Sequence, residues 1–102
     1  MKKIDHIAII DDDPIVVFGL RKLIATSVDC ELIESFGNGK LAYDGISEKL
    51  EENRPFPTLI FLDINMPIMD GWEFLKAFIA LPISDRVKIN IVTSSIDPFD
   101  KE

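Results

Sequence analysis

Cysteine is almost absent from this sequence: Cys30 stands alone, so no disulfide bond can form within the chain. Cysteine usage of this kind is typical of a reducing compartment. No apolar run approaches the roughly 20 residues that a membrane-spanning helix needs. The N-terminal segment, residues 1–6, is charged where a secretory signal peptide would turn apolar. These absences predict a cytoplasmic protein that does not insert into membranes.

Basic residues are also scarce, with 11 lysines and arginines against 18 acids and a formal net charge of −7. A chain with this balance has no electrostatic reason to bind nucleic acid or an anionic membrane by itself. An acidic pocket and cationic partners fit it better. The length of 102 residues allows one domain, and 47% hydrophobic with 28% charged residues is typical of a globular protein.

Four short apolar segments have the character of β-strands. Two are continuous or nearly continuous apolar runs, which indicates strands buried on both faces: Ile7–Ile10 and Thr58–Leu62. A further strand is expected over Val87–Val92. In Glu31–Phe36 charged residues interrupt the apolar ones, which favours a half-exposed strand near the edge of a sheet.

In the segments between these strands, apolar residues recur at the spacing of an α-helix. The first helix is expected to begin at Pro14, and its apolar residues are Val16, Leu20, Leu23 and Ile24. The second is expected from Lys40 to Asn53, with an inner side formed by Ala42, Ile46 and Leu50. The third follows a capping box of Asp70 and Glu73, and its apolar stripe is Trp72, Leu75, Phe78 and Ile79.

This alternation of strands and helices predicts an α/β fold with a parallel sheet and helices on both faces. Ligands of such sheets bind beyond the carboxyl ends of the strands. Three of the four predicted strands end there in polar residues, which are Asp11 and Asp12, Asp63, and Thr93. Segments far apart in the sequence are therefore expected to meet at one rim.

The chemistry of this rim follows from its charge. Three crowded carboxylates repel one another, so at least one is expected to move toward its protonated form unless a cation intervenes. Mg²⁺ prefers oxygen ligands and commonly bridges carboxylates to a phosphate. A carboxylate can also act as a nucleophile and form an aspartyl phosphate, and the hydroxyl of Thr93 could donate to a phosphoryl oxygen.

Each of these residues also has a plainer interpretation. The acids at positions 11–13 alone could form a solvated turn that caps a helix, and this is at least as plausible as a metal site. Asp63 alone could be an ordinary strand-end residue, and Thr93 suits a strand end, with Ser94 as a fallback for the same role. It is the combination, with the spacing between the segments, that favours a metal and phosphoryl site.

Three segments resemble the receiver domain of bacterial two-component response regulators: Ile9–Pro14, Leu62–Gly71 and Ile91–Ser95. The resemblance implies a flavodoxin-like doubly wound parallel sheet with strand order 2-1-3-4. It also implies Mg²⁺ as cofactor and a partner that is a sensor histidine kinase or a histidine phosphotransfer protein. Such a domain is a signalling module that catalyses only its own phosphorylation and dephosphorylation.

The same resemblance implies a role for each matching residue. Asp63 would be the phosphoacceptor and a metal ligand. Asp11 and Asp12 resemble the acidic pair, with Asp12 the more direct ligand, and Asn65 would offer its backbone carbonyl to the metal. Thr93 resembles the hydroxyl that switches the domain.

The sequence also departs from the family. We expect residues 1–102 to form one receiver domain, truncated so that the usual fourth helix, fifth strand and fifth helix are missing. The fifth strand normally ends in a lysine, and without it we expect slower phosphorylation or a less stable product. The exposed edge of the fourth strand would then invite dimerisation or segment exchange.

Two other functions compete with this interpretation. One is a phosphorylation-silent interaction module that keeps the fold without the chemistry. The other is an aspartyl-phosphate phosphohydrolase, whose first strand would end in Asp-x-Asp. Here three adjacent acids precede Pro14, and Asn65 stands two residues after Asp63, so the sequence disfavours the hydrolase.

Overall fold

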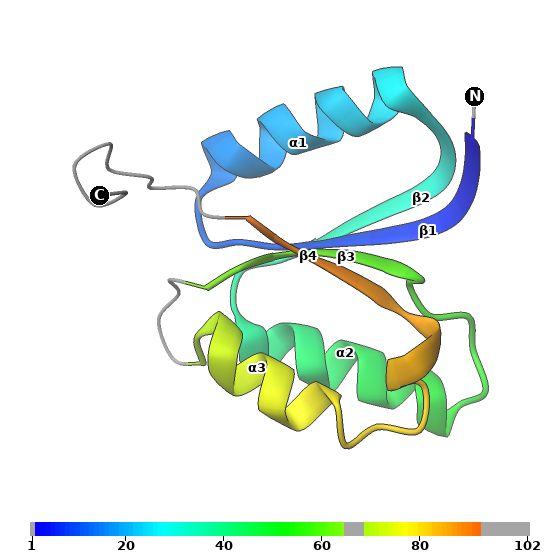
Figure 1. The fold of residues 1–102 in the computed structure, drawn as a ribbon, viewed down its shortest axis with the longest axis vertical. Helices are drawn as coiled ribbons and strands as arrows, with labels where there is room; N and C mark the ends of the chain where they lie inside the picture. The colour runs from blue at the N-terminus through cyan, green and yellow to red at the C-terminus, as the bar shows by residue number, and fades with distance from the viewer. Residues whose placement is uncertain (1, 65–68, 93–102) are drawn as a thin grey trace.

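The structure is a computed structural model and describes residues 2–64 and 69–92. Strands and helices alternate along this part of the chain (Figure 1). The elements are β1 (Lys2–Ile10), α1 (Pro14–Ser27), β2 (Val28–Phe36), α2 (Gly39–Glu51), β3 (Leu59–Asp63), α3 (Gly71–Phe78), a short 3₁₀ helix η1 (Ser84–Arg86) and β4 (Lys88–Val92).

The strands form one parallel sheet in the order β2-β1-β3-β4, which confirms the predicted topology. Helix α1 covers one face of the sheet, and α2 and α3 cover the other (Figure 1). Ile10 of β1 pairs with Leu62 of β3, and Asp63 pairs with Val92 of β4. The carboxyl ends of these three strands therefore lie side by side at one rim.

The core has a larger and a smaller part, because the sheet separates its two faces. The larger part lies between the sheet and α2 and α3, and its buried members are Ala8, Ile10, Ala42, Ile46, Ile60, Leu62, Phe74, Phe78 and Ile83. The smaller part lies under α1, and its buried members are Ile7, Ile9 and Ile24. Neighbouring residues of β1 alternate between the two parts, as the strand pleat requires.

The predicted face of α3 was confirmed at Leu75 and Phe78 but wrong at Trp72 and Ile79. Phe74 and Phe78 are buried one turn apart and stack with ring centroids at 5.5 Å, whereas Trp72 and Ile79 are 55% and 67% exposed. The apolar residues of this helix outnumber the positions that its contact with the sheet can bury. Spacing alone therefore could not identify the buried subset.

Helix α1 shows a similar difference, because Leu23 is 61% exposed and only Ile24 is buried. Val17 and Leu20 pack beside Ile24. In α2 the prediction was confirmed, since Ala42 and Ile46 are buried.

The first two strands begin earlier than their apolar runs suggested. Lys2 already pairs with Val28, whereas the pairing of β1 with β3 begins only at Ile7. The two strands therefore extend together beyond the rest of the sheet. Polar residues are frequent at the starts of both strands, so continuous apolar runs do not reveal where the strands begin.

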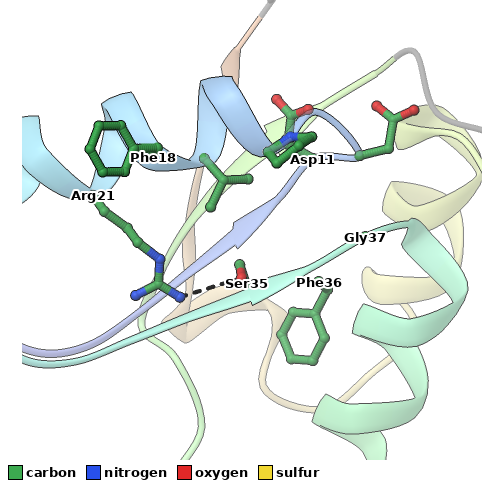
Figure 2. Close-up of a pocket in the computed structure, with 9 residues that line it drawn as sticks. Asp11, Phe18, Arg21, Ser35, Phe36 and Gly37 are labelled. Atoms are coloured by element: carbon green, nitrogen blue, oxygen red, sulfur yellow. Dashed lines mark hydrogen bonds between the residues drawn. The ribbon is translucent and has the colours of Figure 1, made fainter.

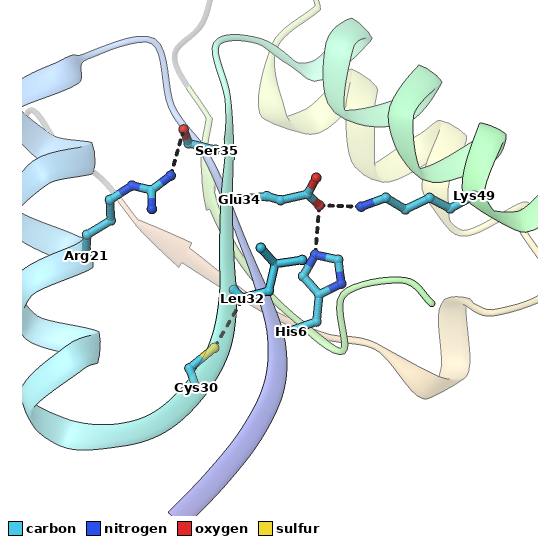
Figure 3. A network of polar contacts seen from close by, with 7 residues as sticks. All are labelled: His6, Arg21, Cys30, Leu32, Glu34, Ser35 and Lys49. Carbon is cyan, nitrogen blue, oxygen red and sulfur yellow. Dashed lines mark hydrogen bonds and ion pairs between the residues drawn. The ribbon is translucent and has the colours of Figure 1, made fainter. Parts of the chain in front are cut away.

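A partly buried polar network ties α2 to the sheet (Figure 3). One carboxylate oxygen of Glu34 on β2, Oε1, forms hydrogen bonds with two side chains. His6 Nε2 of β1 lies 2.7 Å away, and Lys49 Nζ of α2 bonds the same atom. His6 thus has a structural role in this network.

Within the described segments, none of the helices combines the length and the apolar character that crossing a membrane requires.

Candidate functional site

The strand register brings the predicted acids together. Asp11 follows Ile10, whose partner Leu62 precedes Asp63, so the two aspartates stand at the ends of neighbouring strands. One carboxylate oxygen from each of Asp11, Asp12 and Asp63 lies within 4.8 Å of the others. Asp11 and Asp63 are 4% and 2% exposed, whereas Asp12 faces solvent.

The turn between β1 and α1 orients these acids through backbone hydrogen bonds. The Asp11 N–H donates to the Phe36 carbonyl at 3.0 Å, which continues the pairing with β2. The Asp13 N–H donates to Asp11 Oδ1 at 2.8 Å, and the Ile15 N–H donates to Asp13 Oδ1 at 2.9 Å. Asp13 therefore caps α1, as predicted, and its backbone holds the Asp11 carboxylate in place.

The surroundings of Asp11 disfavour its ionised form. The pKa of Asp11 is raised from 3.8 to about 6, and burial is the largest cause. The nearby charges of Asp63, Asp12 and Asp13 act in the same direction, whereas the hydrogen bond from the Asp13 N–H opposes them. One carboxylate was expected to shift in this direction, but burial contributes more than the repulsion on which that expectation was based.

The donor set suits a hard divalent cation. Among the described residues, Asp11 Oδ2 is buried and has no hydrogen-bond partner. A cation at this position would coordinate that oxygen and offset the charge repulsion that raises the pKa of Asp11. The group of Asp11, Asp12 and Asp63 thus fits Mg²⁺ or a similar ion by ligand type, spacing and charge.

Gly71, the first residue of α3, contacts the backbone directly after Asp63. Its N–H donates to the Ile64 carbonyl at 3.2 Å. A Cβ atom at this position would lie 2.6 Å from Ile64 Cα and 2.7 Å from the Asp63 carbonyl oxygen. Only glycine allows α3 to begin this close to the end of β3.

A cavity of about 420 Å³ opens beside the acids, between α1 and β2 (Figure 2). Its lining is formed by Asp11, Asp12, Pro14, Val17, Phe18, Arg21, Ser35, Phe36 and Gly37. Arg21 extends along it and donates from Nη2 to Ser35 Oγ at 3.3 Å. No motif singled out Arg21, because only the packing of α1 against β2 brings it into this cavity.

Two predicted site residues, Asn65 and Thr93, lie outside the described residues, as does Ser94. Their proposed roles therefore stay predictions. Val92, which precedes Thr93 in the sequence, pairs with Asp63, so β4 does run to the same rim as the acids.

Comparison with known proteins adds independent evidence. The sequence profile described as "Response regulator receiver domain" matches residues 7–102. The nitrate/nitrite response regulator NarL of Escherichia coli (strain K12) is 32% identical over 88 residues, which cover 86% of this chain and 38% of NarL. The chain thus spans well under half of the length of that relative.

Solved structures agree with the sequence matches. A two-component response regulator from Cytophaga hutchinsonii is 34% identical, with a TM-score of 0.84 over 98% of this chain and 76% of that one. The Mn²⁺-bound form of response regulator Rcp1 is 29% identical, with a TM-score of 0.72 over 94% of this chain and 70% of that one. Fold, acidic site and sequence together show that the chain belongs to the response regulator receiver domain family.

Proposed function

We propose that this protein is the phosphoacceptor module of a two-component signalling pathway, in which Asp63 receives a phosphoryl group. The donor would be a phosphohistidine of a sensor histidine kinase or of a histidine phosphotransfer protein. The observation that carries this proposal is the meeting of Asp11, Asp12 and Asp63 at the carboxyl rim of the sheet. Membership of the receiver family supports it.

Asp11, Asp12 and Asp63 would hold a Mg²⁺ ion, to which Asn65 would add its backbone carbonyl. The Mn²⁺-bound form of the related Rcp1 supports a divalent cation at such a site. When bound, the cation neutralises charge on the carboxylates and on the oxygens of the transferred phosphoryl group.

The transfer itself uses the carboxylate of Asp63. One of its oxygens attacks the phosphorus, and the new O–P bond forms as the N–P bond of the phosphohistidine breaks. The electron pair of that bond passes to the imidazole, which leaves as a neutral ring because its other nitrogen carries a proton. Burial of Asp63 at 2% exposure limits the access of competing water.

The product would place a phosphoryl group with roughly two negative charges beside Asp11 and Asp12, in place of the single charge of the Asp63 carboxylate. The hydroxyl of Thr93 would donate to one phosphoryl oxygen and so link the modified site to β4. A charge change of this size can bias a surface between two conformations, which is the basis of a signalling switch. The protein would act on no substrate other than its own aspartate.

Incubation with a small acyl phosphate and Mg²⁺, followed by intact-protein mass spectrometry, tests this proposal. We expect a mass gain of one phosphoryl group that disappears with a chelator and in Asp63→Asn. Asp44→Asn is the matched control, because it removes an exposed carboxylate on α2 and should leave the gain unchanged. A gain that persists in Asp63→Asn would contradict the proposal, as would no gain in the wild type.

A further inference from the structure

The N-terminus of α2 touches the chain segment that follows the phosphoacceptor aspartate. The Gly39 N–H donates to the Met69 carbonyl at 3.1 Å, so a backbone bond joins the two segments. Gly39 is buried, and Met69 packs against the larger part of the core. Asn38 fixes the helix end by accepting a bond from the Leu41 N–H at 2.9 Å. The position of Gly39 is therefore set by α2 itself.

No side chain fits at Gly39 without moving Met69. A Cβ atom there would lie 2.7 Å from the Met69 carbonyl oxygen, 2.9 Å from its Cγ and 3.2 Å from its Sδ. The nearest atom belongs to the backbone, so a change of side-chain rotamer cannot relieve the overlap. None of the described glycines has a positive φ, so space and not backbone conformation requires glycine here.

Gly39 and Gly71 both bond residues that lie between Asp63 and α3, but Gly39 does so from α2. Gly71 bonds Ile64, directly after Asp63, and Gly39 bonds Met69, directly before the cap of α3. Together these bonds anchor both ends of the segment that joins the phosphoacceptor strand to α3. Gly71 lies within this segment, whereas Gly39 belongs to a different helix and ties the segment to α2.

We propose that Gly39 is a positioning residue for phosphoryl transfer to Asp63, through its backbone bond to Met69. The inference rests on the function proposed above and names a residue outside the acidic group. Moving Met69 would shift Asp70 and Gly71, whose N–H bonds the Ile64 carbonyl. Ile64 directly follows Asp63, so the carboxylate would move relative to Asp11 and Asp12. Misplacement of a reacting group by about 1 Å can cost on the order of a hundredfold in rate.

The test compares Gly39→Ala with a matched glycine variant away from the acids. Gly19 lies in α1, and a Cβ atom there meets nothing within 4 Å. We expect Gly39→Ala to lower the phosphorylation rate at saturating Mg²⁺ and acyl phosphate by about tenfold to a hundredfold. Gly19→Ala should keep the wild-type rate. If Gly39→Ala is phosphorylated as fast as the wild type, the positioning role of Gly39 is overturned, whereas the proposed function of Asp63 still stands.

Two double variants separate positioning from simple loss of stability. Gly19→Ala should stabilise α1, because alanine is the better helix former, so Gly19→Ala with Gly39→Ala offsets lost stability. We expect this pair to regain thermal stability and to stay slow; recovery of the rate would overturn the inference. Met69→Ala with Gly39→Ala should also stay slow, because the overlap with the Met69 carbonyl oxygen remains. Recovery of the rate in this pair would show that only the Met69 side chain clashes, and it would overturn the role of the backbone bond.

Absence of transfer in the wild-type protein is a distinct result. It would defeat the proposed function, and the positioning role would fall with it.

Discussion

At the scale of single residues, Asp11 combines burial with an unfavourable charge. Its Oδ2 atom has no hydrogen-bond partner in residues 2–64 and 69–92, and its pKa is raised to about 6 by burial and by its acidic neighbours. The folded state therefore binds a proton more tightly than the unfolded state does. Without a cation, the contribution of Asp11 to stability falls as the pH rises from about 4 to about 6, and the cost is complete above that range.

Asp11→Asn is thus expected to stabilise the metal-free protein at pH 7.5 by about 1–3 kcal/mol, because the amide carries no charge. The Asn oxygen can still accept the bond from the Asp13 N–H. Urea unfolding with a chelator measures this gain, which should shrink toward pH 4. A variant that is less stable than the wild type at pH 7.5 would contradict this view of the site.

The acids of the site could be predicted because each follows an apolar strand, and parallel strands end at a common rim. Arg21 and Gly39 could not be predicted in the same way. Arg21 reaches the cavity beside the acids only through the packing of α1 against β2, and Gly39 matters only through its distance to Met69. Contacts of this kind depend on the relative placement of elements, about which local sequence patterns say little.

At the scale of elements, the attachment of α2 to the sheet depends on Glu34. Burial alone would raise the pKa of Glu34, but the hydrogen bonds from Lys49 and His6 outweigh it and hold the pKa below its ordinary value of 4.5. Glu34 is therefore ionised to lower pH in the folded than in the unfolded state. Its stabilising contribution is complete above pH 4.5 and is lost as the pH falls through the lowered pKa.

Glu34→Gln should destabilise the protein by about 1–3 kcal/mol at pH 7, because Lys49 would keep a buried charge without its carboxylate. Asp44→Asn removes the exposed pair with Lys40 and should cost less than about 0.5 kcal/mol. Urea unfolding at pH 7 compares the two variants. Equal losses would show that burial of the network contributes nothing.

The elements themselves were largely predictable, and their buried faces were less so. Strand order, the capping box of Asp70 and the inner side of α2 were confirmed. The face of α3 was confirmed only in part, because the helix carries more apolar residues than the sheet can cover: Phe78 is buried as predicted, but Phe74 rather than Trp72 is buried with it. Burial in such a helix is decided by the angle at which it packs.

At the scale of the whole molecule, a cation at the rim would join β1 and β3 across the centre of the sheet. Ligand that binds only the folded state stabilises it, by about 2.7 kcal/mol at a concentration one hundred times the Kd. We therefore expect Mg²⁺ to raise the unfolding free energy at pH 7.5. Asp12→Asn should abolish most of this gain with little effect on the metal-free protein, because Asp12 is exposed.

Calorimetric titration with Mg²⁺ gives the affinity that this comparison needs. An equal gain in Asp12→Asn and in the wild type would place the cation elsewhere.

The most direct measurement locates the phosphoryl group on the chain. An aspartyl phosphate is reduced by borohydride to homoserine, so peptide mass spectrometry after reduction identifies the modified position. We expect homoserine at position 63 after treatment with acyl phosphate and Mg²⁺, and none when the metal is chelated. Homoserine at position 11, 12 or 70 instead, or at none, would contradict the assignment of Asp63 as the phosphoacceptor.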